Sequence, residues 1–270
     1  MLGRVLIVAG SDSGGGAGLQ ADVKTITMLG AYAATAVTAL TVQNTHGVKD
    51  VMPVPPAFVA AQMAAVLDDI GADAIKLGML GSAEVIDAVV RCLERKARSI
   101  PVVVDPVMVA KGGAPLLAAD AVSAVKLRLV PLAAVITPNV PEAEALTGLS
   151  IRSVDDLGRA ADHLLALGAG AVLMKGGHLE GEQVVDILRT ADGEQVVLEA
   201  ERANTRHTHG TGCTLASAVA AGIADGLRLA DAVVRAHDYV QNAIRRAPGL
   251  GGGHGPLHHG HPLDVPRREA

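Results

Sequence analysis

The sequence contains no tryptophan, one phenylalanine (Phe58) and two tyrosines (Tyr32 and Tyr239). The core must therefore be built from Ala, Val, Leu and Ile, which suits a buried parallel sheet with helices on both faces. A chain of 270 residues suits one large domain, which we expect to span residues 1–270, although the length also allows two smaller domains.

Cysteine is also scarce, and the sequence has no run of basic residues. Two cysteines, Cys92 and Cys213, argue against a disulfide scaffold and for a reducing compartment. The net charge of −5 without a basic run argues against nucleic-acid binding. Residues 25–48 are uncharged but rich in Thr, Gly, Gln and Asn, which makes a poor membrane span. The first ten residues have the pattern of a strand and not of a signal peptide. We expect a cytoplasmic protein with no membrane or nucleic-acid partner.

Short β-branched runs alternate with longer helical patterns, which is typical of an α/β fold. Strands are predicted at residues 5–9, 36–42, 74–77, 102–105, 135–137 and 171–174. Helices are predicted at residues 19–29, 56–69, 83–97, 119–130, 141–146, 154–167, 211–225 and 229–246. A hairpin turning at Asp192-Gly193 predicts antiparallel strands at one sheet edge. We expect a mainly parallel sheet flanked by helices on both faces, with a small antiparallel edge.

The C-terminal tail, residues 246–270, is rich in glycine and histidine. A metal-binding tract is possible in principle, but His254, His258, His259 and His261 show no regular ligand spacing. We expect a flexible or loosely docked terminus.

Polar loops follow the carboxyl ends of the predicted strands, where an open α/β sheet binds its ligands. One of them, GSDSGGGAGLQAD at residues 10–22, holds five glycines but lacks the spacing of a P-loop or dinucleotide motif. A turn that needs positive φ angles explains one or two glycines. We expect the surplus to let the backbone approach a ligand.

A second loop, HTHGTGC, leads directly into a helix of small residues. Gly210, Thr211, Gly212 and Cys213 would present backbone N–H groups at the helix N-terminus, which is an anion site. That position predicts a thiol pKa lowered from about 8.5 towards neutrality or below. Cys213 could take a proton, attack an electrophile, or simply pack, whereas Cys92 lies on an apolar helical stripe and is expected to be structural.

Further polar and charged residues follow other predicted strands, at the same edge of the sheet. Asp105, Asn139 and Glu142 are hard oxygen ligands that suit Mg²⁺, which keeps its waters and shares substrate phosphates. Each of them alone could equally be a helix cap or turn residue. Lys175 ends an apolar strand beside two glycines, as expected for a phosphate contact. Together with the anion site they predict phosphoryl transfer.

Gln43 ends an apolar run, where its carboxamide offers a donor and an acceptor side by side. That pair matches a heteroaromatic edge with an amino group next to a ring nitrogen. A structural amide that ties down a loop is an equal alternative.

Nearly the whole chain resembles the bacterial hydroxymethylpyrimidine/phosphomethylpyrimidine kinases of thiamine biosynthesis, in the ribokinase superfamily. The resemblance rests on eight segments in family order: AGSDSGGGAGLQAD, TALTVQNTHGV, KLGML, DPVMVAKGG, ITPNVPEAEAL, LMKGGH, HGTGCTLASAVAAG and HGPLHH. It implies a ribokinase-like fold and ATP- and Mg²⁺-dependent phosphorylation of 4-amino-5-hydroxymethyl-2-methylpyrimidine, then of its monophosphate. It also implies a homodimer.

The resemblance places the family's functional residues on this chain. The anion hole falls on Gly210, Thr211, Gly212 and Cys213, with Cys213 as the general base. The implied substrate contacts are Gly10, Ala17, Asp22, Gln43, Met79 and Val107. Lys175 and Asn139 would bind the nucleotide, and Asp105, Asn139 and Glu142 the metal. The segment AKGGAPLL departs from the family pattern AKSGDPLL and lacks its hydroxyl and carboxylate.

Three other functions stay open at this stage. A pyridoxal or pyridoxine kinase of the same superfamily would use a similar set of residues. A cysteine hydrolase or acyltransferase would use Cys213 with His207 or His209, although no Asp or Asn partner is evident. A non-catalytic sensor of pyrimidine or nucleotide would bind without forming ADP.

Overall fold

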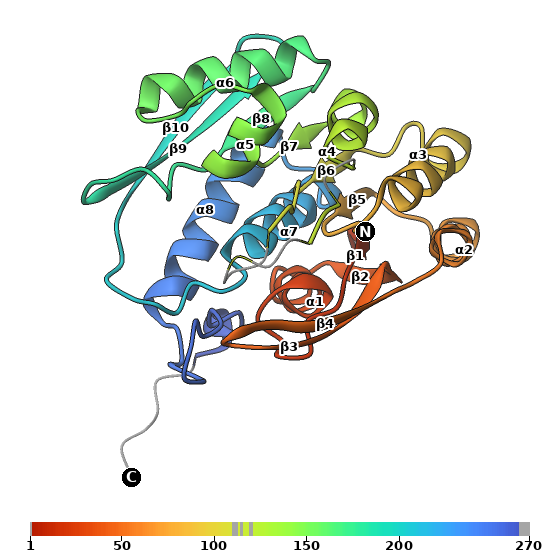
Figure 1. The fold of residues 1–270 in the computed structure, drawn as a ribbon, viewed down its shortest axis with the longest axis horizontal. Helices are drawn as coiled ribbons and strands as arrows, with labels where there is room; N and C mark the ends of the chain where they lie inside the picture. Colours follow the sequence, from red (N-terminus) through yellow and green to blue (C-terminus); the bar gives the residue numbers. More distant parts are fainter. Residues whose placement is uncertain (1, 110–112, 114–115, 119–120, 265–270) are drawn as a thin grey trace.

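The computed structural model describes residues 2–109, 113, 116–118 and 121–264 (Figure 1). Within these residues a central sheet has the strand order β10-β9-β8-β7-β6-β5-β1-β2. Its parallel strands are β1 (Arg4–Ala9), β2 (Tyr32–Val37), β5 (Ala74–Leu77), β6 (Val102–Val104), β7 (Val135–Ile136) and β8 (Ala171–Met174). The hairpin of β9 (Gln183–Thr190) and β10 (Gln195–Glu201) adds an antiparallel edge, as predicted.

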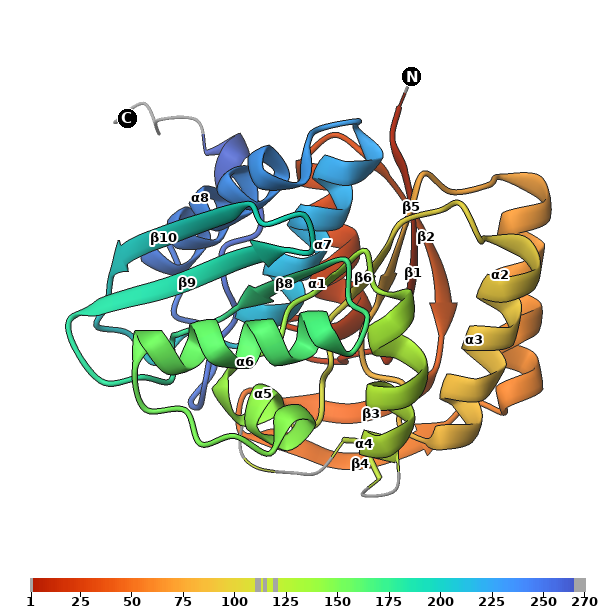
Figure 2. The same cartoon turned by 90° about the horizontal axis from the view of Figure 1, so that it is seen from above.

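Helices cover both faces of this sheet (Figure 2). One face packs against α2 (Pro56–Asp69), α3 (Ala83–Lys96), α4 (Ala121–Ala124), α5 (Val140–Thr147) and α6 (Val154–Ala166). The other packs against α1 (Gly18–Met28), α7 (Thr211–Ala224) and α8 (Leu229–Arg245). Strand β1 shows why both faces are apolar, because Leu6 and Val8 enter one core while Val5 and Ile7 enter the other. The predicted fold class is confirmed.

The strand predicted at residues 36–42 is wrong. Strand β2 ends at Val37, and β3 (Ala39–Asn44) leaves the central sheet to pair with β4 (Gly47–Pro53), which was not predicted. Thr38 makes the break, because its N–H donates to Ala9 and its hydroxyl donates to the Met79 carbonyl. The run of small and β-branched residues suits a strand throughout and carries no signal of this change of sheet.

Two other regions also differ from prediction. The helix predicted at residues 119–130 is α4 followed by a π-helical turn (Val125–Leu129) and a 3₁₀ turn (Val130–Leu132), with residues 119–120 outside the described chain. The prediction of a loosely attached C-terminus is wrong for residues 254–259. Leu257 and His259 are buried, and His254 N donates to Thr45 while His258 N donates to Ala243. No described helix is long and apolar enough to cross a membrane.

The strand order places the site. Strand β1 lies between β5 and β2, so the chain changes direction across the sheet at β1. In open α/β sheets, ligands bind beyond the carboxyl ends of the strands at such a point. The loops that follow β1 and β5 begin there, at Gly10 and Gly78.

Candidate active site

A cavity of about 880 Å³ lies at these strand ends. Thirteen of the predicted site residues line it together: Gly10, Ala17, Gln43, Met79, Asp105, Val107, Asn139, Glu142, Lys175, Gly210, Thr211, Gly212 and Cys213. The residues converge from loops after β1, β5, β6, β7 and β8, from β3, and from the start of α7. The segment with the unusual sequence AKGGAPLL is described only at Gly113, Leu116 and Leu117, and Gly113 and Leu116 also line the cavity.

The loop before α7 has the geometry of an anion site. Gly210 caps the helix with φ of 86°, a conformation that favours glycine. A Cβ atom on Gly210 would lie 1.8 Å from the Gly16 carbonyl oxygen, so no larger residue fits against the first glycine loop. The amides that follow begin α7, and its dipole adds positive potential there.

Cys213 lies where two helices begin. Its thiol receives a hydrogen bond from the Gly18 backbone at the start of α1, and Cys213 itself is in the first turn of α7. The prediction of a lowered thiol pKa is nevertheless wrong. Burial raises the pKa of Cys213 to about 12, and Asp105 and Asp22 add to the rise while Lys76 opposes it. Cys213 is therefore a neutral thiol at pH 7.

Two acidic side chains, Asp105 and Glu142, lie around Lys175 next to the anion loop. Lys175 Nζ is 3.1 Å from Asp105 Oδ1 and 3.8 Å from Glu142 Oε2. A Cβ on Gly212 would lie 3.0 Å from the same Nζ atom, so the anion loop and this group are in contact. Burial raises the pKa of Glu142 to about 7, which Lys175 opposes and Asp105 reinforces. Asp105 Oδ2 is buried with no hydrogen-bond partner among the described residues.

Asn139 and Glu142 also cap a helix, which was the alternative interpretation of both. The Asn139 side chain accepts from Glu142 N at 2.9 Å, and Glu142 Oε2 accepts from Asn139 N at 2.8 Å. This capping box starts α5. The cap fixes the Glu142 carboxylate beside Lys175, so the structural role positions the charge.

Asp22 is placed differently from the other predicted residues. It is not part of the described cavity lining, and it is fully buried against Lys76, whose Nζ lies 2.9 and 2.8 Å from its two oxygens. Ser217 also donates to it at 2.7 Å. Sequence reasoning missed Lys76, which lines the cavity, although a lysine within the apolar strand Ala74–Leu77 was a usable signal.

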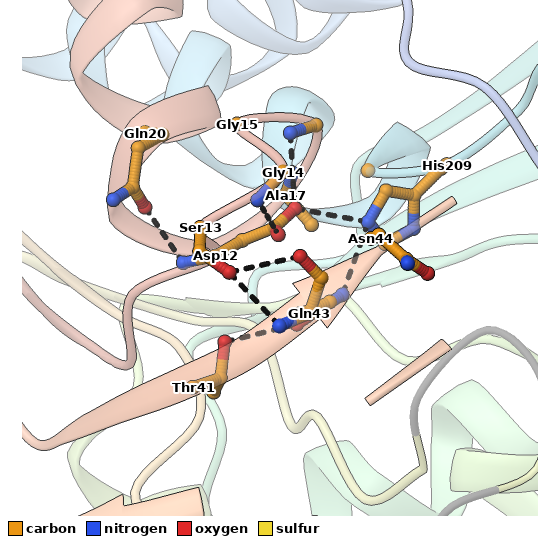
Figure 3. Close-up of polar contacts among 12 residues, drawn as sticks. Asp12, Ser13, Gly14, Gly15, Ala17, Gln20, Thr41, Gln43, Asn44 and His209 are labelled. Atoms are coloured by element: carbon orange, nitrogen blue, oxygen red, sulfur yellow. Dashed lines mark hydrogen bonds and ion pairs between the residues drawn. The ribbon is translucent and has the colours of Figure 1, made fainter. Parts of the chain in front are cut away.

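Asp12 is the second residue that sequence reasoning missed (Figure 3). Its carboxylate accepts from Gly14 N at 2.8 Å, Gly16 N at 2.9 Å and Ala17 N at 2.8 Å. His209 Nε2 lies 3.0 Å from Asp12 Oδ2. Burial raises the pKa of Asp12, but the hydrogen bonds from His209, Ala17 and Gly14 outweigh it and leave that pKa below its ordinary value.

These contacts also give the glycines a reason that we did not expect. A Cβ on Gly16 would lie 2.6 Å from His209 Cδ2, and one on Gly18 would lie 2.4 Å from the Gly10 carbonyl oxygen. Both glycines are therefore required by the close contact of protein with protein. The loop of residues 10–18 is built around Asp12 and against the anion loop.

Gln43 reaches the cavity because strand side chains alternate. Thr41 and Gln43 on β3 point into it, while Leu40 and Val42 on the same strand are exposed on the other side. Gln43 Nε2 lies 3.1 Å from His209 Nε2, and Thr41 Oγ1 lies 3.3 Å from Gln43 Oε1. The amide therefore joins the Asp12–His209 pair.

Comparison with known proteins relates this site to one family. The family described as Phosphomethylpyrimidine kinase matches residues 12–258. A hydroxymethylpyrimidine/phosphomethylpyrimidine kinase of Haemophilus influenzae is 49% identical over 95% of this chain and 96% of its own length. A thiamine biosynthesis bifunctional protein of Geobacter sulfurreducens is 54% identical over 95% of this chain, which spans only 52% of that longer protein.

Solved structures show the same fold. A Bacillus subtilis pyridoxal kinase in complex with ADP has a TM-score of 0.89 at 38% identity, covering 98% of this chain and 100% of its own. A phosphomethylpyrimidine kinase of Clostridium difficile has a TM-score of 0.78 at 42% identity, covering 89% and 99%. The ribokinase-like fold is confirmed. With a family match along almost its whole length, this chain belongs to the phosphomethylpyrimidine kinases and is a phosphotransferase.

Proposed function

We propose that this enzyme transfers the γ-phosphoryl group of ATP to the hydroxymethyl group of 4-amino-5-hydroxymethyl-2-methylpyrimidine, and then to the resulting monophosphate. The observation that carries the proposal is the position of the anion loop, residues 210–213. In one cavity it lies between Gln43, which suits a heteroaromatic edge, and Lys175 with its carboxylates, which suit a nucleotide. Gly10, Ala17, Met79 and Val107 would enclose the pyrimidine.

Phosphoryl transfer needs positioning and charge stabilisation more than covalent chemistry by the protein. The amides of Gly210, Thr211, Gly212 and Cys213 would hold the charge that develops on the transferred group. One such donor is worth about 2.7–4 kcal/mol in the transition state. Lys175 would contact the nucleotide phosphates from the opposite side, with Asn139 beside it.

Cys213 would accept the proton of the attacking hydroxyl. Because burial raises its pKa to about 12, the base is a small thiolate fraction at neutral pH. Lys76, Gly18 N–H and the α7 dipole all favour that anion. Asp22 would act indirectly in this scheme, because it holds Lys76 and does not line the cavity.

The residues present fit Mg²⁺. Asp105 Oδ2 is a buried oxygen without a hydrogen-bond partner in the described chain. Burial raises the pKa of the neighbouring Glu142 to about 7, because Lys175 compensates its charge only in part. No cluster of three or more His, Cys, Asp or Glu side chains that could hold a metal occurs among the described residues. Asp105, Glu142 and Asn139 would therefore hold the ion together with water and phosphate oxygens, as Mg²⁺ prefers. When bound, it would neutralise charge on the phosphates.

An ADP-release assay tests the proposal. The purified enzyme would be given ATP, Mg²⁺ and one acceptor at a time: the pyrimidine alcohol, its monophosphate, pyridoxine, or a sugar. We expect the highest kcat/KM with the two pyrimidines. Background ADP release with both pyrimidines would overturn the proposal.

Pyridoxine or pyridoxal phosphorylation is the second candidate, because pyridoxal kinases are among the structures most similar to this one. In the same assay it predicts a kcat/KM for pyridoxine at least equal to that for the pyrimidine alcohol. A cysteine hydrolase is ruled out as the main activity by membership of a kinase family. His209 Nε2 also lies against Asp12 and Gln43, as part of their hydrogen-bond network.

We propose that the enzyme is a homodimer that uses the outer face of the β3–β4 sheet. Leu40, Val42 and Met52 are 45%, 56% and 61% exposed there, an unusual group of large apolar side chains at the surface. Light scattering at micromolar concentration should give twice the chain mass of 27.4 kDa. Val42→Lys should shift the mass to that of the monomer, and a monomeric parent would refute the proposal.

A cytoplasmic location is the remaining part of this proposal. Both cysteines are free, and Cys92 is buried in the core as part of α3. Free buried thiols suit a reducing compartment. Fractionation of cells that express the enzyme should place it with cytoplasmic markers.

A further inference from the structure

Gln43 is held at both ends of its amide group by neighbours whose hydrogen-bonding roles are fixed (Figure 3). One end of the amide faces His209 Nε2 at 3.1 Å, and the other faces Thr41 Oγ1 at 3.3 Å. An amide end must match its partner, because its oxygen only accepts and its NH₂ group only donates. The neighbours therefore determine which end is which.

The role of His209 follows from Asp12. Asp12 Oδ2 already accepts from Gly16 N and Ala17 N, and the low pKa of Asp12 makes it a carboxylate, which can only accept. His209 Nε2, 3.0 Å away, must therefore carry a proton and donate to it. A protonated Nε2 has no lone pair for an amide N–H. The end of Gln43 beside His209 must be the oxygen, which shares the single Nε2 proton with Asp12.

The role of Thr41 leads independently to the same orientation. Thr41 Oγ1 donates its single proton to the Ser11 carbonyl at 2.8 Å. Towards Gln43 the Thr41 hydroxyl can then only accept a hydrogen bond, so the end beside Thr41 must be the NH₂ group. Asp12 and Ser11 thus require the same amide orientation, which is turned by 180° from the one drawn in Figure 3.

We propose that Asp12 and His209 are positioning residues that hold the Gln43 oxygen on the His209 side and the Gln43 nitrogen on the Thr41 side. One lone pair and one N–H of the amide then stay available to the cavity in a fixed order. A substrate must place its own donor towards His209 and its acceptor towards Thr41. On the proposed function, the pyrimidine amino group faces Gln43 Oε1 and the adjacent ring nitrogen faces Gln43 Nε2.

The first test is made on the free enzyme and does not depend on the proposed function. Nitrogen-15 NMR of the histidine rings distinguishes a protonated from an unprotonated Nε2. The His209 signals are assigned by their loss in His209→Gln, and the measurement is made at pH 8. We expect Nε2 of His209 to carry a proton. An unprotonated Nε2 would overturn the proposal.

The second test measures selectivity. The compound 5-hydroxymethyl-2-methylpyrimidin-4-one presents a carbonyl and a ring N–H, the reverse order of the amino-pyrimidine edge. We expect the parent to prefer the amino compound strongly in kcat/KM. His209→Ala frees the amide to turn, so that preference should fall at least tenfold, the scale of one hydrogen bond to a buried group. His209→Gln, whose amide nitrogen replaces Nε2 as donor, should restore it.

A double-mutant cycle separates this role from a general effect on the anion loop. If His209 acts through Gln43, His209→Ala should change selectivity in the parent and leave it unchanged in Gln43→Ala. Equal changes in both backgrounds, or unchanged selectivity in His209→Ala, would refute the proposal. If His209→Ala does not fold, Thr41→Val tests the other end of the amide by the same ratio. If the parent phosphorylates neither compound, the proposed function fails while the NMR result still decides the orientation.

Discussion

Asp12 and Glu142 are carboxyl groups at different ends of the cavity, and their surroundings shift their pKa values in opposite directions. At the β3 end, Asp12 accepts hydrogen bonds from three backbone amides and His209, and its pKa lies below the ordinary value. At the β8 end, Asp105 Oδ2 lacks a partner in the described structure, and the pKa of Glu142 is raised to about 7. Lys175 forms ion pairs with both Asp105 and Glu142.

The two ends therefore differ in how far their own hydrogen bonds and charges are already satisfied within the protein. The β3 end is complete without a ligand, so its hydrogen bonds position the pyrimidine side of the site in advance. At the β8 end, burial is outweighed at Asp105 by Lys175 and Lys76, which hold its pKa below the ordinary value, whereas the charge of buried Glu142 is only partly compensated. That partial compensation costs stability, and a further bound cation would offset the cost. The pKa of Cys213 is set by burial and by the charges of Lys76, Asp105 and Asp22.

The largest expected effect is at Cys213. Cys213→Ala removes the general base but leaves the backbone amides, so kcat should fall about 10²–10⁴-fold with little change in ATP binding. Cys213→Asp should recover part of the loss, because a carboxylate can also accept the proton. Cys92→Ala is the matched control and should keep the parental kcat. Near-parental turnover in Cys213→Ala would leave only the anion site at this loop.

The pH dependence of kcat/KM should show the raised pKa of the same thiol. Because the thiolate is the active form, its fraction rises about tenfold per pH unit as long as the pH is below the pKa of about 12. We expect kcat/KM for the pyrimidine to rise with unit slope from pH 7 to 9. In Cys213→Asp the rise should move to acidic pH. A parental profile that is flat over this range would contradict a thiol base.

Gln43→Ala should disturb the β3 end alone. Loss of the amide leaves ligand polar groups unpaired and should weaken pyrimidine binding by about 1–3 kcal/mol. The KM for ATP and the Mg²⁺ requirement should barely change, because those interactions are at the β8 end. An unchanged KM for the pyrimidine would remove Gln43 from the site.

Glu142→Gln should disturb the β8 end alone, with the smallest effect of the series. The Mg²⁺ concentration for half-maximal activity should rise several-fold, while the KM for the pyrimidine stays the same. In the parent, Mg²⁺ affinity should weaken as the pH falls below about 7, because the proton then occupies Glu142. The glutamine of the variant does not titrate, so its Mg²⁺ affinity should not weaken for this reason as the pH falls below about 7. Overlapping Mg²⁺ titrations of variant and parent would show that Glu142 does not hold the ion.

Local patterns in the sequence were sufficient for most of the architecture. Alternating β-branched and helical runs predicted the parallel sheet, and Asp192-Gly193 predicted the hairpin at its edge, because both signals arise between residues close in the chain. The same patterns could not show that the chain changes sheets at Thr38, since that depends on hydrogen bonds to Ala9 and Met79. The C-terminal residues were misjudged for the same reason, because Leu257 is buried by distant parts of the chain.

The sequence by itself determined which chemical groups meet at the strand ends, because parallel strands bring the residues that follow them to one edge. Only the tertiary structure decided their electrostatics. Helix position alone predicted an acidic thiol at Cys213, but burial beside Asp105 and Asp22 has the larger effect and raises its pKa. Asp12 and His209 are separated by 197 positions, so no local pattern could reveal that they form a pair. Burial and charge act through space, and their sum at one atom is set by the completed fold.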